Sequence, residues 1–158
     1  MIRPATPADA ADIADIHVQA WDETYTDLVP PDEIAARDFP FRLHQWTTTL
    51  AAADTRTAFL PGLGFAQTGP QRLPHLAETH PDELYCLYLL RQGQGRGHAR
   101  ALLDAVRSDR AMTALVLAGN TRASAFYAAA GAVLIDTQPC RVGDTDTEEY
   151  VYAWPATA

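Results

Sequence analysis

The chain has 158 residues, of which 47% are hydrophobic and 20% are charged. This length fits one domain with a sizeable core, and the apolar fraction argues against a wholly disordered chain. The formal net charge of −8 disfavours contact with a nucleic-acid backbone. The same charge would attract cations, including protonated amines.

Two further classes are disfavoured by the sequence. The cysteines, Cys86 and Cys140, stand far apart and form no metal-ligand pattern. Residues 1–4 do not begin a signal peptide, and no apolar run approaches the roughly 20 residues of a membrane-spanning helix. We therefore expect a cytoplasmic protein with no metal, no membrane partner and no nucleic-acid partner.

The first half of the chain predicts two helical stretches and a hairpin. Thr6, Pro7 and Asp9 form a helix start, with Trp21 and Tyr25 at or beyond the end of that helix. The apolar residues in between recur at helical spacing: Ala10, Ile13, Ile16 and Ala20. A second helical stretch opens at residues 30–33 and resumes over residues 41–53 after a break at Pro40. Two short strands, 57–60 and 63–68, follow with a turn between them.

The second half alternates strands with helices. Residues 69–81 predict a loop, and residues 83–90 predict an apolar strand covered on both faces. A glycine-rich stretch, a helix, a strand at 113–118 and a helix at 120–130 come next, the last closed by Gly131. Two final strands, 132–135 and 150–154, flank an acidic loop at 144–149. The sequence predicts a mixed α/β fold in a single domain over residues 1–158.

The glycine-rich turn between strand and helix is the informative segment. Glycines at a helix N-terminus let a phosphate approach unpaired backbone N–H groups, so the turn favours a phosphorylated ligand. The turn lacks the Gly-Lys-Ser/Thr of a phosphate loop. It also fails the dinucleotide fingerprint, because the third glycine would fall on His98 or Arg100. A plain strand–helix connection with spare glycines remains an alternative when the turn is considered alone.

Three segments together are similar to the GNAT superfamily of N-acetyltransferases. Gln94, Gly97 and Ala99 match its Q/R-x-x-G-x-G/A acetyl-CoA motif. Residues 120–131 resemble its second signature, N-x-x-A-x-x-F-Y-x-x-x-G, and residues 2–9 are typical of its first strand and helix. The resemblance covers nearly the whole chain and is weakest over residues 21–81. It implies a central mixed, mostly antiparallel sheet flanked by helices and splayed at the cofactor site.

The resemblance also implies how acetyl-CoA, the acetyl donor, binds. Pantetheine amides would pair with the strand edge formed by Leu87, Tyr88 and Leu89. Asn120 would bond the pantetheine arm or the local backbone. The pyrophosphate would lie on backbone amides of the glycine-rich turn, that is, of Gln94, Gly95, Arg96, Gly97, His98 and Ala99.

Acetyl transfer to an amine requires a base for the ammonium and benefits from an acid for the departing thiolate. Tyr127, at the Phe-Tyr position of the second signature, is the candidate acid, with core packing as the alternative. Glu83 is the candidate base, and a solvated strand end, Asp82 or water are the alternatives. Trp21 and Tyr25 are candidate lining of the acceptor pocket, where ordinary packing is an equal alternative.

The predicted function is therefore acetyl-CoA-dependent N-acetylation of a small-molecule or peptide amine, with a homodimer left open. Two other functions fit part of the sequence. A non-catalytic acetyl-CoA-binding module would need the turn but neither Tyr127 nor Glu83. A nucleotide-binding protein is disfavoured by the missing lysine and third glycine.

Overall fold

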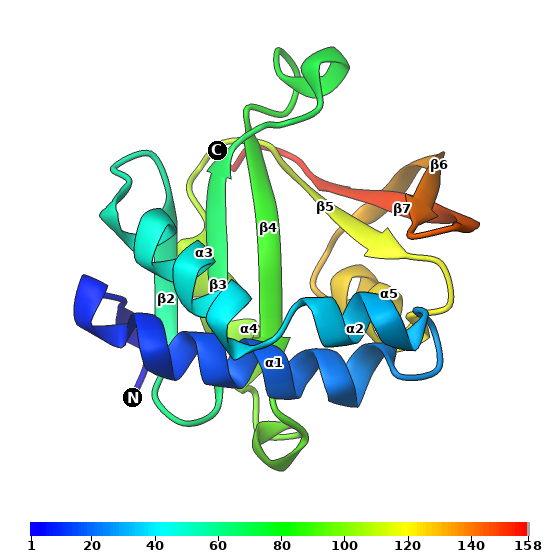
Figure 1. Ribbon diagram of the computed structural model, residues 1–158. Helices are drawn as coiled ribbons and strands as arrows, with labels where there is room; N and C mark the ends of the chain where they lie inside the picture. Colours follow the sequence, from blue (N-terminus) through cyan, green and yellow to red (C-terminus); the bar gives the residue numbers. More distant parts are fainter. Residues whose placement is uncertain (158) are drawn as a thin grey trace. The chain divides into compact units, whose positions relative to one another are not determined.

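The computed structural model describes residues 1–157 and contains a mixed sheet with helices (Figure 1). Its strands and helices, in chain order, are β1 (Arg3–Pro4), α1 (Ala10–Tyr25), α2 (Pro31–Ala36), α3 (Phe39–Ala51), β2 (Arg56–Leu60), β3 (Gly64–Pro70), β4 (Asp82–Leu89), α4 (His98–Val106), β5 (Met112–Leu117), α5 (Thr121–Ala129), β6 (Val133–Val142) and β7 (Thr145–Trp154). The strand order is β1-β2-β3-β4-β5-β7-β6. β4 and β5 are parallel, whereas β1–β2, β2–β3, β5–β7 and β6–β7 are antiparallel. The predicted mixed, mostly antiparallel sheet is confirmed.

Internal contacts divide the chain into two compact units. Unit 1 comprises residues 1–68 and 86–107, and unit 2 comprises residues 69–85 and 108–158. The chain passes from unit 2 to unit 1 inside β4, between Tyr85 and Cys86, and not in a linker. The single-domain organisation stays a prediction. No helix within residues 1–157 is both long and apolar enough to cross a lipid bilayer.

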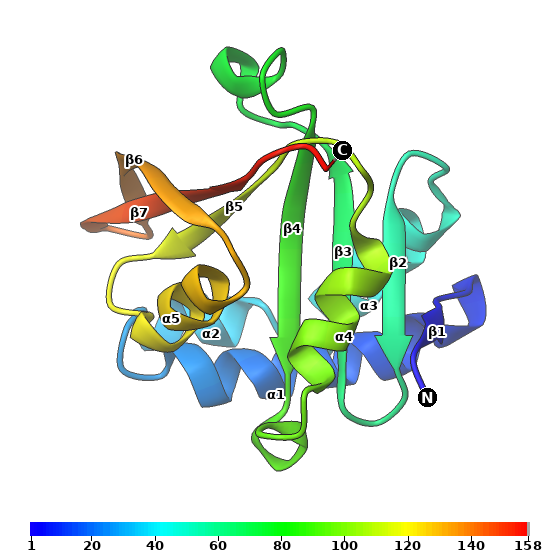
Figure 2. The ribbon, with the colours of Figure 1, turned by 180° about the vertical axis from the view of Figure 1, so that it is seen from behind.

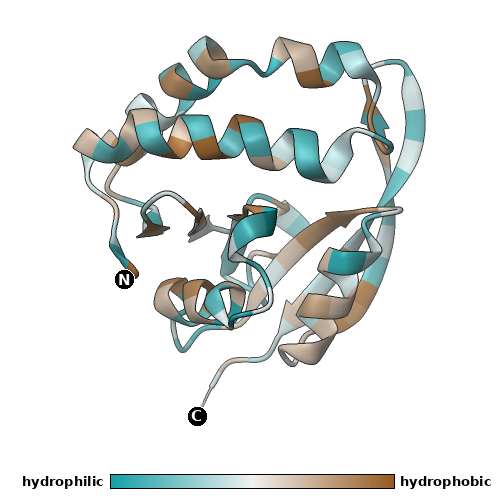
Figure 3. Cartoon of the chain, turned by 90° about the horizontal axis from the view of Figure 1, so that it is seen from below, coloured by the Kyte–Doolittle hydropathy of each residue, from teal (hydrophilic) through white to brown (hydrophobic). Residues whose placement is uncertain are grey.

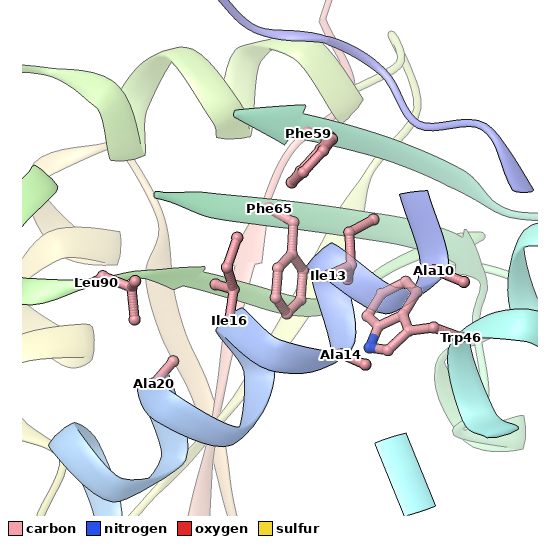
Figure 4. Packing of buried hydrophobic residues seen from close by; sticks show 9 residues of the cluster. All are labelled: Ala10, Ile13, Ala14, Ile16, Ala20, Trp46, Phe59, Phe65 and Leu90. Carbon is pink, nitrogen blue, oxygen red and sulfur yellow. The ribbon is translucent and has the colours of Figure 1, made fainter. Parts of the chain in front are cut away.

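Unit 1 places helices on both faces of its strands. α1 and α3 cover one face of β2 and β3, and α4 lies on the other face (Figures 1 and 2). Hydrophobic and hydrophilic residues alternate along the helices in Figure 3, as expected of elements with one buried side. The buried cluster in Figure 4 confirms the helical spacing expected of α1, and its members are Ala10, Ile13, Ala14, Ile16, Ala20, Trp46, Phe59, Phe65 and Leu90.

Three sequence-based boundaries in unit 1 are wrong. Pro7 begins a 3-10 turn, and α1 itself begins at Ala10, because the Asp9 carboxylate accepts hydrogen bonds from the Thr6 backbone (2.7 Å) and from Arg3 (2.7 Å). Pro40 does not break the second helical stretch. It occupies the first turn of α3, where a missing N–H is tolerated. Trp21 lies inside α1, whereas Tyr25 is its last residue, as expected.

A buried histidine links α1 to α3. His17 is 4% exposed, and its Nδ1 accepts a hydrogen bond from the Trp46 indole N–H at 3.0 Å. An accepting Nδ1 carries no proton, so the ring is neutral with its proton on Nε2. Burial, followed by the charge of Arg42, lowers the pKa of His17 to about 2. Protonating this ring would remove its hydrogen bond and bury a charge.

We expect this histidine to make the fold sensitive to mild acid. The unfolded chain takes up the His17 proton near pH 6.5, whereas the folded chain does so only near its lowered pKa. Stability is therefore lost as pH falls below about 6.5, by up to about 1.4 kcal/mol per pH unit from this group. Denaturant unfolding at pH 7 and pH 5 measures the effect. His17→Gln should flatten this pH dependence, whereas exposed His44→Gln on α3 should not; equal slopes in all three proteins would contradict the assignment.

Unit 2 is built on β5, β7 and β6, with α5 packed against them. β5 pairs with β7 from Met112↔Trp154 to Leu117↔Glu149. Trp154 on β7 donates its indole N–H to the carbonyl of Ala130 at the end of α5, at 3.1 Å. The ladder between β4 and β5, in contrast, has only three residue pairs and ends at Leu84↔Ala114. The parallel pairing therefore ends within unit 2, one residue before the chain passes into unit 1 after Tyr85.

The end of the chain differs from its prediction. Residues 144–149 do not form a loop between two short strands. β6 and β7 each have ten residues and pair as one long hairpin, with Gly143 at a φ of +58° between them. Most residues in the middle of β6 and in the first half of β7 are polar, so the sequence shows no alternation of apolar residues over the full length of either strand.

Candidate active site

The turn between β4 and α4, all within unit 1 from Cys86 onward, is shaped by two glycines. After a 3-10 turn at Arg91–Gly93, the backbone adopts φ of +79° at Gly95 and +81° at Gly97, the residue that precedes α4. Side-chain-bearing residues rarely adopt these angles. A Cβ built at either glycine would meet no atom within 4 Å. Glycine is therefore needed at both positions for the backbone angles, and not to avoid a clash with other protein atoms. The space beside both residues is open.

That open space lies beside polar backbone groups. The first N–H groups of a helix have no carbonyl one turn earlier to receive them, and the helix dipole makes this end positive. α4 presents this end immediately after Gly97. The turn is accordingly suited to an anion, with Arg96 exposed and His98 partly buried beside it.

Side chains fix the turn in place from both ends. Gln94 donates its amide Nε2–H to the carbonyl of Leu89, the last residue of β4, at 2.9 Å. The Arg91 backbone N–H donates to the Glu23 carboxylate on α1 at 2.8 Å. Gln94 Oε1 is buried and has no hydrogen-bond partner within residues 1–157. The turn is therefore held without using the N–H groups at the start of α4.

Three aromatic residues meet beside this turn in unit 1. Trp21 donates its indole N–H to the Tyr88 hydroxyl at 3.2 Å, and the hydroxyls of Tyr25 and Tyr88 lie 3.4 Å apart. Burial, followed by the neighbouring Tyr25, raises the pKa of Tyr88 well above its usual value. The structure thus brings both acceptor-side candidates into contact with β4, the strand expected to bind pantetheine. Leu87 and Leu89 on the same strand are half-buried.

The remaining candidates lie in unit 2. Asn120 precedes α5, and its Oδ1 accepts the Ala123 backbone N–H at 3.2 Å, which makes it a helix cap. Tyr127 is 7% exposed, and its ring packs against Trp154 with centroids 5.5 Å apart and against Tyr152 at 6.2 Å. These contacts hold the Tyr127 ring firmly on β7.

Glu83 is not solvated at a strand end. It is 1% exposed, and Arg72 holds its carboxylate through Nη2 at 2.6 Å and Nε at 3.2 Å. The Arg72 backbone N–H adds a third donor at 3.0 Å, and the guanidinium lies 4.0 Å from the Tyr85 ring centroid. Neighbouring Asp82 accepts from Ser108 at 2.6 Å and pairs with Arg110 at 3.4 Å. Both carboxylates are therefore engaged by arginines of unit 2.

Two arginines were missed by sequence reasoning. A glutamate in an otherwise apolar strand signals that a cation must accompany it, and Arg72 fulfils that need. Arg42 is buried on α3 and carries no comparable signal in the sequence. Within residues 1–157 no group of three or more His, Cys, Asp or Glu residues is placed to hold a metal ion.

Comparisons with known proteins identify the fold. No family model matches the sequence. The chain is 33% identical over 107 residues to a Bacillus subtilis protein named uncharacterized N-acetyltransferase YuaI, an alignment covering 65% of the chain and 59% of that relative. The chain therefore spans less than two thirds of that relative's length.

Solved structures align over nearly the whole chain. PaiA N-acetyltransferase from Thermoplasma acidophilum, in complex with coenzyme A, matches with a TM-score of 0.70, 16% identity and 98% coverage of both chains. YncA from Salmonella typhimurium, with its cofactor acetyl-CoA, matches with a TM-score of 0.68, 20% identity and coverage of 98% and 92%. The chain has the fold of the GNAT superfamily of N-acetyltransferases, and the resemblance drawn from its sequence is confirmed.

Proposed function

We propose that this protein transfers an acetyl group from acetyl-CoA to a primary amine. The observation that carries the proposal is the open turn at Gly95 and Gly97, whose backbone leads into the free N-terminus of α4. Two proteins of the same fold contain coenzyme A or acetyl-CoA. In this proposal the N–H groups of residues 94–99 hold the pyrophosphate, and residues 87–89 of β4 pair with the pantetheine arm.

The reaction requires a direct attack of the amine nitrogen on the thioester carbonyl. The carbon–nitrogen bond forms, the carbon–sulfur bond breaks, and the thiolate leaves as free CoA. The ammonium loses one proton before attack, the attacking nitrogen loses a second to solvent as the carbon–sulfur bond breaks, and the thiolate gains one as it leaves. We assign the proton that the thiolate gains to the Tyr127 hydroxyl because of the place of Tyr127 in the N-x-x-A-x-x-F-Y signature.

The base is proposed to be Glu83, although its carboxylate is already paired with Arg72. A carboxylate that already accepts several hydrogen bonds has few free lone pairs left to take the ammonium proton. Asp82 is similarly engaged, so water is the competing route for the ammonium proton.

Glu83→Gln is expected to lower turnover most at mildly acidic pH, where the amine most needs a base. Arg72→Met is the matched variant because it removes the partner and keeps the carboxylate. If Glu83 is the base, the pH–rate profile changes in Glu83→Gln, while Arg72→Met chiefly lowers the melting temperature. If both variants lose stability equally and keep the shape of the wild-type pH–rate profile, Glu83 only anchors the segment that carries Arg72. Water then takes the ammonium proton.

Acetyl-CoA binding provides a test that needs no acceptor. Saturating acetyl-CoA should raise the melting temperature, since a ligand at 100 times its dissociation constant adds about 2.7 kcal/mol of stability. CoA should act similarly, whereas ATP and NAD should not. A melting curve that acetyl-CoA leaves unchanged in the folded protein would refute the cofactor assignment.

A non-catalytic acetyl-CoA-binding module is the second candidate function. The engagement of Glu83 by Arg72 and the packing of the Tyr127 ring favour it, because both give these residues a structural purpose. Release of free CoA with a panel of amines separates the two functions. A protein that binds acetyl-CoA and releases none with any amine would be the binding module.

A further inference from the structure

Arg42 is an anomaly within unit 1. Arg42 is only 4% exposed, yet no carboxylate of residues 1–157 pairs with its guanidinium. Its Nε and Nη2 are buried without any hydrogen-bond partner there, and only Nη1 is used, donating to Gln45 Oε1 at 2.9 Å. Buried charges in proteins are normally paired, because an unsatisfied charged donor loses its hydration without compensation. In a chain with a net charge of −8, a carboxylate partner would be readily available.

The surroundings of Arg42 make its charge more costly. Its guanidinium lies 4.8 Å from the Trp21 ring centroid, and Arg37 lies 5.0 Å from the same ring. Two cations thus share one indole. Burial, with a smaller contribution from the charge of Arg37, lowers the pKa of Arg42 to about 10. Arg37 has a carboxylate partner in Glu33, at 3.0 Å, but Arg42 has no carboxylate partner within residues 1–157. An anion at Arg42 would relieve both the burial and the repulsion.

The two unused nitrogens define the shape of that anion. Nε and Nη2 form one edge of the guanidinium, and their N–H bonds are parallel, which matches the two oxygens of a carboxylate. Unit 2 shows this pairing in the same chain, where Nε and Nη2 of Arg72 hold the Glu83 carboxylate at 3.2 and 2.6 Å. In Arg42 the same edge has no partner among residues 1–157.

The position of Arg42 connects this edge to the acceptor side. It stacks on Trp21, whose indole N–H binds Tyr88 on β4. The other ring near its guanidinium is Phe41, at 5.5 Å, which is 48% exposed. Exposed side chains change rotamer on the picosecond to nanosecond timescale. Phe41 is therefore the neighbour best able to move aside and admit a ligand.

We infer that the Nε/Nη2 edge of Arg42 binds a carboxylate of the acceptor, so that the acceptor class is amines that carry a carboxylate, such as amino acids. This inference rests on the proposed acetyl transfer for its catalytic meaning, but the recognition itself is a binding property of unit 1. Trp21 forms the wall beside the carboxylate, whereas Arg37 is paired with Glu33 and has no part in binding it.

Two assays test the inference. The first measures CoA release with alanine, leucine, phenylalanine and glutamate, each against its own α-carboxamide. The wild type should favour at least one free acid over its carboxamide by tenfold or more in kcat/KM. Arg42→Lys keeps the positive charge but loses the paired Nε and Nη2 donors. The ratio of kcat/KM for the acid to kcat/KM for its carboxamide should therefore fall toward one. Arg37→Lys, which alters the other cation on Trp21, should keep the ratio.

The second assay needs no turnover and separates failure of the inference from failure of the proposed function. The N-acetyl derivatives of the same four amino acids and of their carboxamides are titrated calorimetrically onto the full chain. At least one acid should bind tenfold more tightly than its carboxamide in the wild type and in Arg37→Lys, but not in Arg42→Lys. Such binding without any CoA release would support the carboxylate site and refute the enzyme. Equal binding of acids and carboxamides would overturn the carboxylate site, whether or not an amine is acetylated.

Discussion

Replacing Tyr127 with phenylalanine is expected to reduce kcat by about 10²–10⁴-fold, the usual contribution of a positioned general acid. Only the hydroxyl is lost, and the ring contacts with Trp154 and Tyr152 remain. Acetyl-CoA affinity and the melting temperature should therefore change little. Because the lost interaction forms in the transition state, kcat and kcat/KM should fall together. Steady-state kinetics with an identified acceptor measures the effect.

Tyr152→Phe is the matched control for this variant. Tyr152 lies on β7 in the same aromatic cluster, and the proposal gives its hydroxyl no part in the reaction. Its replacement should leave kcat near the wild-type value. If Tyr127→Phe binds acetyl-CoA and turns over within about threefold of wild type, well below the expected range, Tyr127 is a packing residue. The thiolate would then leave unprotonated or take its proton from water.

The second large effect is expected at Gly97. A valine there would place a branched side chain in the open space beside the first N–H groups of α4, where the pyrophosphate is proposed to lie. Loss of two charge-assisted hydrogen bonds, each contributing about 1.5–3 kcal/mol, predicts a decrease in acetyl-CoA affinity of the order of 10²–10⁴-fold. Isothermal calorimetry with acetyl-CoA measures it.

Backbone strain has to be separated from loss of binding in this experiment. Gly97 has a φ of +81°, so valine also adds strain of about 1–3 kcal/mol. Gly62 in the β2–β3 turn is the matched control, since its φ is +75° and a Cβ there also meets no atom within 4 Å. Gly62→Val should lose similar stability and keep acetyl-CoA affinity. Wild-type affinity in Gly97→Val would show that the turn does not hold the pyrophosphate.

Features set by local physics were predictable from the sequence. The glycine-rich turn, the cap at Asn120 and the positive φ of +95° at Gly131 depend on residues within a few positions of one another. The apolar spacing of α1 likewise follows from one helix period. The turn at Pro61 and Gly62 and its flanking strands were predicted, with the second strand placed one residue too early, because the apolar strand residues stop at this proline and glycine.

Features set by distant partners were not predictable. The pairing of Glu83 with Arg72 joins residues on opposite sides of the 73–81 segment, and the sequence shows the need for a cation but not which one. Arg42 became notable only once its burial and its missing partner within residues 1–157 were seen. The β6–β7 hairpin was mispredicted because cross-strand pairing, and not alternation of apolar residues, defines its length.

The central claim is that this chain moves an acetyl group from acetyl-CoA to an amine. Mass spectrometry of a reaction with acetyl-CoA carrying an isotopically labelled acetyl group tests it most directly, using a broad amine panel that includes the free amino acids. The account predicts that at least one amine acquires the labelled acetyl group, with an equal amount of free CoA, and that Gly97→Val abolishes the product. Binding of acetyl-CoA without any labelled amine in the whole panel would contradict it.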